Sequence, residues 1–248
     1  MRFTYVIGYR HSPDRIINLR RTIDWLSGFN NIDLVLIEQD KYSKISHLNL
    51  RAKHLFLKTD KPYNRSWAFN VAIKRNNNPI IIFGDSDLVM DPHQFIESIN
   101  QMDKYEVVSP YSTVLDLTPD ESMLDINGMS QIKRPGRGEE DNQKINLCGG
   151  IVMFRADSIV KIGGFCEQFE GWGAEDNFQT MKVEKMGLTF KEMPYKAYHL
   201  WHQKSQVDMG LYQKSLSMLE QMDKLDRDKI QMHINATLPK IGFLNKYY

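Results

Sequence analysis

The chain has only two cysteines, no long apolar run and almost no excess of charge of either sign. Cys148 and Cys166 are too few for a disulfide framework or a zinc knuckle, which predicts reduced thiols. No stretch reaches the roughly 18 apolar residues of a membrane-spanning helix. The apolar run at Met1–Gly8 is too short for a signal peptide. These features predict a cytoplasmic protein, and the net charge of +1 argues against nucleic acid as a partner.

The composition is that of a folded protein with a substantial core. Hydrophobic residues make up 42% of the 248 residues and aromatic residues 11%. This content is ample for a packed core and argues against disorder. The length fits one large α/β domain, with room for a modest extension.

Strand and helix patterns alternate along the first hundred residues. Apolar runs of strand length occur at 3–8, 33–38, 54–58 and 80–83, and helical patterns at 13–26 and 64–74. Such alternation predicts a Rossmann-like, mixed but mostly parallel sheet flanked by helices. The predicted fold class is therefore α/β.

The pattern changes after Pro110. Residues 112–142 are polar and weakly periodic, which indicates either disorder or a functional lid. We expect a partly mobile loop that shapes one side of a site. A strand at 147–154, containing Gly149 and Gly150, and helices at 156–162, 175–186 and 205–225 follow. The tail, 239–248, mixes aromatic residues with lysines, and we expect it to dock on the domain, with contact to a membrane surface as the alternative.

An acidic triplet follows the buried strand at 80–83. Asp85 and Asp87 are one residue apart where the strand breaks into a loop. In open α/β sheets ligands gather at the carboxyl ends of the strands, so both acids are placed to face a site. Their oxygens suit Mg²⁺ or Mn²⁺, although most such triplets are simply polar turns.

Two histidines stand three residues apart near position 200. The spacing of His199 and His202 would put both side chains on one face of a helical turn. Two imidazoles and one or two carboxylates form a plausible Mn²⁺ site, because imidazole adds affinity for transition metals. Without the acidic triplet, a surface or packing pair would be the simpler interpretation.

The segment Phe169–Phe178 places a tryptophan between glycines and then two acids. Trp172 offers an apolar platform, and small neighbours let a ligand approach closely. Glu175 and Asp176 open a helical pattern, so their directions are held by a rigid element, as a general base requires. The alternative is an ordinary acidic first turn after a glycine-rich loop.

In this order, these segments resemble the GT-A glycosyltransferases, in particular the β-1,4-galactosyltransferase family and the galactosaminyltransferase modules of bacterial chondroitin synthases. The resemblance spans about 3–203. It is carried by five segments: Val6–Arg15, Leu34–Glu38, Tyr63–Ala72, Asp85–Asp87, and the glycines before Gly171–Asp176.

The resemblance implies one glycosyltransferase domain over 1–248. Its parts would be a nucleotide-binding half at 1–110, an acceptor and catalytic half at 111–204, and a C-terminal helical extension at 205–248. The implied site has Asp176 as catalytic base and a metal, Mn²⁺ or Mg²⁺, on three side chains. The implied metal ligands are Asp87, His199 and His202; acceptor contacts are Glu175, Trp172 and Gly150; nucleotide contacts are Tyr9, Arg10, Asp14, Arg65 and Asp85.

The sequence departs from the family at two of these positions. His199 stands where the animal enzymes often carry a methionine ligand, and Ala174 replaces a commoner glycine. Both changes are compatible with the implied chemistry: transfer of a galactose-, GalNAc- or GlcNAc-type sugar from a UDP-sugar to a glycan hydroxyl, with inversion. The alternatives are a retaining enzyme like the polypeptide GalNAc-transferases and a non-catalytic glycan-binding protein.

Overall fold

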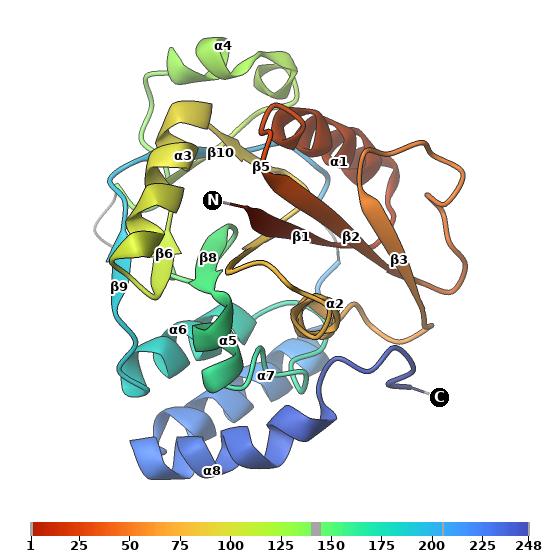
Figure 1. Cartoon of the computed structure of the whole chain (residues 1–248). Coiled ribbons are helices and arrows are strands. Elements are labelled where there is room, and N and C mark those ends of the chain that lie inside the picture. Colours follow the sequence, from red (N-terminus) through yellow and green to blue (C-terminus); the bar gives the residue numbers. More distant parts are fainter. Residues whose placement is uncertain (1, 140–144, 205, 248) are drawn as a thin grey trace.

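The computed structural model describes residues 2–139, 145–204 and 206–247. A seven-stranded sheet with the order β3-β2-β1-β4-β8-β6-β9 forms its centre (Figure 1). Its strands are, in chain order, β1 (Phe3–Tyr9), β2 (Ile32–Asp40), β3 (Lys53–Lys58), β4 (Ile80–Gly84), β6 (Val107–Ser109), β8 (Val152–Arg155) and β9 (Phe190–Glu192).

The sheet has a parallel half and a mixed half. β3, β2, β1 and β4 are all parallel neighbours, as the strand–helix alternation predicts. β8 runs antiparallel to both β4 and β6, and β9 is parallel to β6. The predicted mixed, mostly parallel sheet is confirmed.

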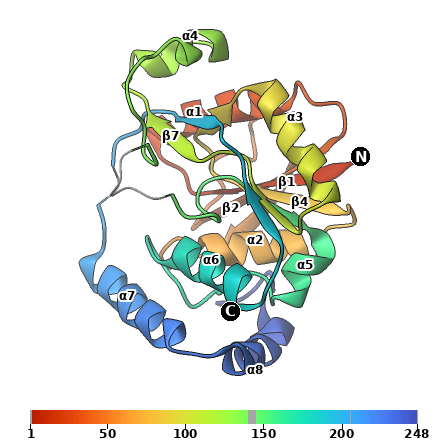
Figure 2. The same ribbon diagram turned by 90° about the vertical axis from the view of Figure 1, so that its left-hand side faces the viewer.

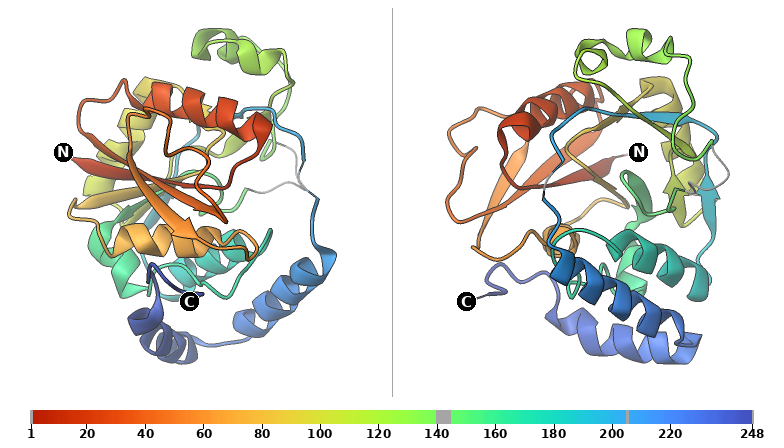
Figure 3. Two further views of the ribbon diagram at one scale, coloured as in Figure 1. Left: turned by 90° about the vertical axis from the view of Figure 1, so that its right-hand side faces the viewer. Right: turned by 180° about the vertical axis from the view of Figure 1, so that it is seen from behind.

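Helices cover both faces of this sheet (Figures 2 and 3). One face packs against α1 (Pro13–Leu26) and α3 (Pro92–Asn100), and the other against α2 (Arg65–Ile73), α5 (Ala156–Lys161) and α6 (Glu175–Lys185). Side chains of β1 alternate between the two cores: Tyr5 and Ile7 join the first, and Val6 the second. This alternation follows from the two-residue period of a strand.

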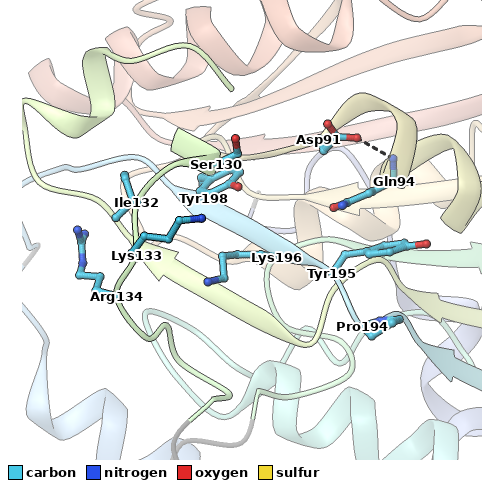
Figure 4. Close-up of a pocket in the computed structure, with 10 residues that line it drawn as sticks. All are labelled: Asp91, Gln94, Ser130, Ile132, Lys133, Arg134, Pro194, Tyr195, Lys196 and Tyr198. Carbon is cyan, nitrogen blue, oxygen red and sulfur yellow. Dashed lines mark hydrogen bonds between the residues drawn. The ribbon is translucent and has the colours of Figure 1, made fainter. Parts of the chain in front are cut away.

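A second, three-stranded sheet has the order β5-β10-β7. Its strands are β5 (Leu88–Met90), β7 (Thr113–Asp116) and β10 (Lys196–His199). β10 lies antiparallel to β5 and parallel to β7, so His199 is paired with Leu88 on one side and with Asp116 on the other. The sheet therefore joins the end of the acidic triplet to the histidine segment. A surface hollow lies beside it, lined by Asp91 and Gln94 at the start of α3, by residues 130–134, and by residues 194–198 in and before β10 (Figure 4).

The first turns of α1 and α2, which contain Arg15 and Arg65, are each fixed by a side-chain helix cap. The Arg15 backbone N–H donates to the Ser12 side chain at 3.3 Å, with Pro13 at the first helical position. The Trp67 backbone N–H donates to the Asn64 side chain at 2.8 Å. A side-chain acceptor at this position satisfies a donor that has no partner within the helix. The backbone positions of Arg15 and Arg65 are consequently well defined.

The expectation of a long loop at 112–142 is wrong for its described part. This segment contains β7, a 3₁₀ turn at Glu121–Met123 and α4 (Ile126–Ser130). Arg134 pairs with Glu121, and Val114 and Arg137 form a backbone bridge. Hydrogen bonds between short elements hold the chain without long periodic patterns, which is why periodicity failed to show them. Residues 140–142 lie outside the described part.

The remaining boundaries differ modestly from expectation. The strand expected from residue 147 begins at Val152, because the two glycines before it form a turn. The last helical region comprises α7 (Met209–Asp223), α8 (Arg227–Thr237) and a 3₁₀ turn at Leu238–Lys240. None of the described helices is long and apolar enough to cross a bilayer.

The C-terminal tail docks on α2, as expected. The Trp67 indole N–H donates to the Phe243 carbonyl oxygen at 2.6 Å, and its ring meets the Tyr247 ring edge to face. Tyr247 also donates to a carboxylate oxygen of Glu170 at 2.6 Å. Contact of this tail with a membrane surface stays a prediction.

Candidate active site

Asp87, His199 and His202 form one cluster at the junction of the two sheets. One ligand atom from each lies within 4.8 Å of the others. The nearest contacts are His202 Nε2 to Asp87 Oδ2 at 3.4 Å and His199 Nε2 to Asp87 Oδ1 at 3.7 Å. The sequence predicted these three residues as metal ligands, and the fold brings them together.

The geometry of the histidine pair differs from the expected helical turn. His199 is the last residue of β10, and His202 follows in an extended segment. Pairing of β10 between β5 and β7 imposes the strand, and the Leu200 N–H donates to the Asp87 carbonyl at 2.8 Å. The two rings nevertheless approach each other, with centroids 5.2 Å apart. The helical interpretation is wrong, while the cluster it predicted exists.

Each histidine has its other ring nitrogen engaged. His199 Nδ1 lies 2.9 Å from Asp116 Oδ1, and His202 Nδ1 lies 2.9 Å from the Gln203 carbonyl oxygen. Both partners can only accept, so Nδ1 carries the proton in each ring and Nε2 can offer a lone pair toward Asp87. A carboxylate and two such imidazoles suit Mn²⁺, so the residues present fit the predicted metal.

The charges around this cluster explain its pKa shifts. Burial raises the pKa of Asp87 against the opposing effect of the nearby histidines and Arg15. Burial alone would lower the pKa of His199, but Asp116 and Asp87 raise it overall. The hydrogen bond from His199, together with Arg137, lowers the pKa of Asp116 to about 2. A carboxylate at Asp116 is therefore the stable form at neutral pH.

Arg15 is a site residue that sequence reasoning missed. Its guanidinium donates to Asp87 Oδ2 at 3.3 Å and lies 3.4 Å from His202 Nε2. The resemblance drew attention to Arg10 and Asp14 instead, although Arg15 follows Asp14 in the same first turn. A guanidinium beside the metal ligands is suited to binding a diphosphate.

The predicted nucleotide turn has mainly internal contacts. Arg10 donates to the carbonyl oxygens of Gln39 and Lys61 at 2.9 and 2.8 Å. The hydroxyl of the buried Tyr9 lies 3.2 Å from His11 Nδ1. Asp14 accepts from the Gln203 backbone N–H at 3.3 Å. The turn is thus tied to β2 and to the segment that follows the metal ligands.

Arg65, which is buried, and Asp85, which is partly exposed, form an ion pair beside the Asp87–His199–His202 cluster. Arg65 Nε donates to Asp85 Oδ1 at 2.9 Å, and its Nη2 donates to the Gly150 carbonyl oxygen at 2.9 Å. Burial would lower the pKa of Arg65, but the carboxylates of Asp85, Asp176 and Glu175 raise it overall. This arginine consequently links the acidic triplet to the glycine turn, and its charge interacts with the two acids at the start of α6.

Glu175 and Asp176 occupy the first turn of α6, as predicted. The residue before them, Ala174, has φ of 69°, a left-handed conformation that redirects the chain into the helix. The Gly173 N–H donates to Glu175 Oε2 at 3.1 Å. Asp176 lies against Gly149, where a Cβ atom would stand 3.2 Å from Asp176 Oδ2. The absence of a side chain there leaves room at this carboxylate.

Both acids are partly buried, and their pKa values rise. Burial, followed by repulsion from Asp176, raises the pKa of Glu175 to about 8. Burial also raises the pKa of Asp176, although Arg65 and a hydrogen bond from Glu175 oppose the rise. Desolvation therefore outweighs the helix dipole, a balance that sequence could not decide. A pKa of about 8 keeps Glu175 mostly protonated at neutral pH.

Trp172 is exposed beside this pair. Its side chain is 65% exposed, and its ring lies 5.5 Å from the Tyr212 ring at an angle of 32°. Tyr212 belongs to α7, which packs over the loop containing Gly171 and Gly173. The C-terminal helices therefore contribute an aromatic ring to this side of the site, which no sequence pattern indicated.

Comparison with known proteins agrees with this geometry. A family model described as the N-terminal domain of galactosyltransferase matches residues 142–204, the stretch that contains Trp172, the α6 acids and both histidines. A search of curated protein sequences gave no match. Solved structures resemble the chain over most of its length.

Three of these structures illustrate the similarity. A Drosophila β-1,4-galactosyltransferase 7 mutant with manganese, UDP-Gal and xylobiose has a TM-score of 0.56 and 14% identity, covering 92% of this chain and 84% of its own. S. aureus TarS 1-349 has a TM-score of 0.60 and 13% identity, covering 96% and 71%. Glucosyl-3-phosphoglycerate synthase from Mycobacterium tuberculosis, with Mn²⁺, UDP and glucosyl-3-phosphoglycerate, has a TM-score of 0.59 and 13% identity, covering 90% and 80%.

This chain has the GT-A glycosyltransferase fold. Two of the three structures contain manganese, and the chain itself places an Asp–His–His group at the end of β4. Identities of 13–14% establish the fold alone, so the chemistry has to be argued from the chain's own residues.

Proposed function

We propose that this protein is a metal-dependent, inverting glycosyltransferase that moves a galactose-, GalNAc- or GlcNAc-type sugar from a UDP-sugar to a glycan hydroxyl. The observation that carries the proposal is the pairing of two clusters across one arginine. Arg65 donates to Asp85, next to the Asp87–His199–His202 group, and to the carbonyl oxygen of Gly150, whose neighbour Gly149 lies against Asp176 of the Glu175–Asp176 pair.

The donor side would be assembled from the carboxyl ends of β1 and β4. Asp87, His199 and His202 would hold Mn²⁺ or Mg²⁺, which neutralises the negative charge that develops on a diphosphate leaving group. Arg15 lies beside these ligands and would bind a phosphate oxygen. Asp85, 39% exposed and fixed by Arg65, has an oxygen available for a ribose hydroxyl.

The acceptor side would use the first turn of α6. Asp176 accepts the proton of the attacking hydroxyl, and its raised pKa makes it a stronger base than a solvated aspartate. Glu175, which holds a proton near neutral pH, can donate a hydrogen bond to the acceptor or to Asp176. Trp172 supplies an exposed ring on which a sugar can stack.

The single-base arrangement supports inversion. The proposed base stands on α6, whereas the groups that would meet the leaving diphosphate lie after β4, at and after the end of β10, and in the first turn of α1. Attack from the base side and departure on the metal side constitute one displacement. UDP-Gal in the Drosophila structure and UDP-GlcNAc in a TarS structure support a UDP-sugar donor, and xylobiose in the former supports a glycan acceptor.

Two alternatives compete with this proposal. A retaining enzyme of the polypeptide GalNAc-transferase type would share the metal site but would not require Asp176 as a base. A glycan-binding protein without activity would use Trp172 and leave the Glu175–Asp176 pair without a role. A cytoplasmic location and the division into two functional halves stay predictions.

The test is release of UDP from a panel of UDP-sugars, with Mn²⁺ and then with EDTA. We expect Mn²⁺-dependent release from one donor, and Asp176→Asn to lower it about 10²- to 10⁴-fold, the usual contribution of a general base. UDP binding should persist in this variant. Asp157→Asn is the matched control, because Asp157 is an exposed acid in the first turn of α5.

Each competing function predicts a different result. NMR of the product formed from an α-linked donor would show a β linkage for inversion, and an α linkage would establish retention. Absence of release and of UDP binding, even with Mn²⁺, would refute the transferase. UDP binding without release from any donor would favour a binding protein.

A further inference from the structure

Asp116, at the end of β7, is in contact with a proposed metal ligand but was predicted by no sequence motif. Its Oδ1 lies 2.9 Å from His199 Nδ1. The two residues are opposite each other in the β7–β10 ladder, so strand register fixes their approach. A role for Asp116 at the metal rests on the proposed function, in which His199 is a metal ligand.

Arg137 holds the same carboxylate from its other side. Its Nε donates to Asp116 Oδ2 at 2.8 Å and its Nη2 to Oδ1 at 3.0 Å, a two-point contact that fixes the carboxylate plane. The Arg137 backbone is itself anchored, because Val114 and Arg137 exchange N–H···O bonds of 2.9 and 2.8 Å. The guanidinium therefore starts from a defined position although its side chain is 47% exposed.

The hydrogen bond to Asp116 determines what His199 can do. A carboxylate only accepts, so His199 Nδ1 must donate and Nε2 is left as the ligand atom. The bond also fixes the ring rotation that points Nε2 toward Asp87. His202 is oriented in the same way by a backbone carbonyl, which substitution cannot remove. Asp116 is thus the residue through which ligand orientation can be altered.

We propose that Asp116 is a positioning residue for the metal ligand His199, and that Arg137 in turn holds Asp116. The segment from β7 to Arg137, expected from sequence to be part of a partly mobile loop shaping one side of a site, is on this view part of the metal centre. Asp116 is held at both ends of this segment: β7 pairs with β10, and the Arg137 side chain binds the Asp116 carboxylate.

The test is the affinity for Mn²⁺ in the absence of any substrate, measured by the electron paramagnetic resonance signal of free Mn²⁺. Loss of a residue that supports a metal-binding histidine typically weakens metal affinity about 10- to 100-fold. We expect this loss for Asp116→Ala. A smaller loss is expected for Asp116→Asn, which keeps an accepting oxygen, and for Arg137→Gln.

Two reference variants make the result specific. His199→Ala removes the ligand itself and sets the largest loss to be expected. Lys196→Gln is the matched control, because Lys196 lies on the same strand as His199 and pairs at 3.2 Å with Glu139, two residues beyond Arg137. It should bind Mn²⁺ as the wild type does. Melting temperatures without metal should be similar for Asp116→Ala and wild type, since Asp116 is 53% exposed.

The outcomes separate this proposal from the proposed function. Unchanged Mn²⁺ affinity in Asp116→Ala, with a clear loss in His199→Ala, would overturn the role of Asp116 and leave the metal site intact. A fall in metal-free melting temperature without a change in affinity would likewise overturn it, in favour of a purely structural role. If neither His199→Ala nor His202→Ala weakens Mn²⁺ binding, the metal site itself is wrong.

Discussion

The partly buried Glu175–Asp176 pair predicts a measurable pH dependence of stability. Glu175 has a pKa of about 8 in the folded protein against 4.5 for an ordinary glutamate, chiefly because burial penalises its charged form. Between these values the folded state binds a proton that the unfolded state has released. Stability must therefore fall as pH rises through this interval, and replacing Glu175 by glutamine should remove that fall.

The magnitude follows from the shift. Each pKa unit corresponds to about 1.4 kcal/mol. Integrating the linkage from pH 5 to pH 8 gives a loss of about 3 to 4 kcal/mol for wild type that Glu175→Gln should not show.

Urea unfolding at pH 5, 6, 7 and 8, without metal, provides the assay. Plotted against pH, the difference in unfolding free energy between Glu175→Gln and wild type should rise steadily in favour of the variant. Glu184→Gln is a suitable control, since Glu184 is an exposed acid on the same helix. Parallel curves for wild type and Glu175→Gln, within about 1 kcal/mol, would refute the idea that burial keeps this acid protonated.

Three further predictions concern other parts of the molecule. Tyr212→Ala should raise the acceptor KM about 2- to 10-fold, because the Trp172 ring loses the ring that packs against it. Donor hydrolysis should be unchanged, and Tyr212→Phe should behave as the wild type. Equal acceptor KM values for Tyr212→Ala and wild type would show that Tyr212 does not support Trp172. Burial lowers the pKa of Lys182 to about 8, so between about pH 8 and 10.5 this lysine is protonated in the unfolded state but not in the folded state. The melting temperature of the wild type should therefore rise with pH in this range relative to that of Lys182→Met. The same pH dependence of the melting temperature in both proteins would contradict this. Gly150→Ala should lower the melting temperature far more than Gly187→Ala. Both glycines have positive φ, but only a Cβ at Gly150 would meet another atom, the Tyr111 hydroxyl oxygen at 2.2 Å. Similar losses of melting temperature would show that backbone strain dominates.

Sequence predicted the parallel half of the sheet well, because each strand and its following helix carry their own pattern. β1 is an almost continuously buried apolar run, and α1 buries residues at the helical period. β6 and β9 have three residues each, too few to show a period, and are defined only by pairing with distant strands. Their existence follows from tertiary contacts that no local window contains.

The site residues also fall into those that a local sequence pattern predicts and those that depend on tertiary contacts. Asp87 could be predicted because it follows a buried strand, and Asp176 because it opens a helix. His199 and His202 were correctly grouped from a helical spacing that the structure does not have, since a strand end followed by an extended segment also brings them together. Asp116 was missed because its significance lies in the β7–β10 register, and register depends on the whole sheet.

The small sheet also bears on the order of events during synthesis. Asp87 is translated long before His199 and His202, and only pairing of β10 between β5 and β7 unites them. A nascent chain that has completed β1 to β4 holds the triplet aspartates but has no histidine partner for them. Metal capture on the ribosome must therefore wait until β10 has emerged, so Mn²⁺ can stabilise the finished domain but cannot template its first half.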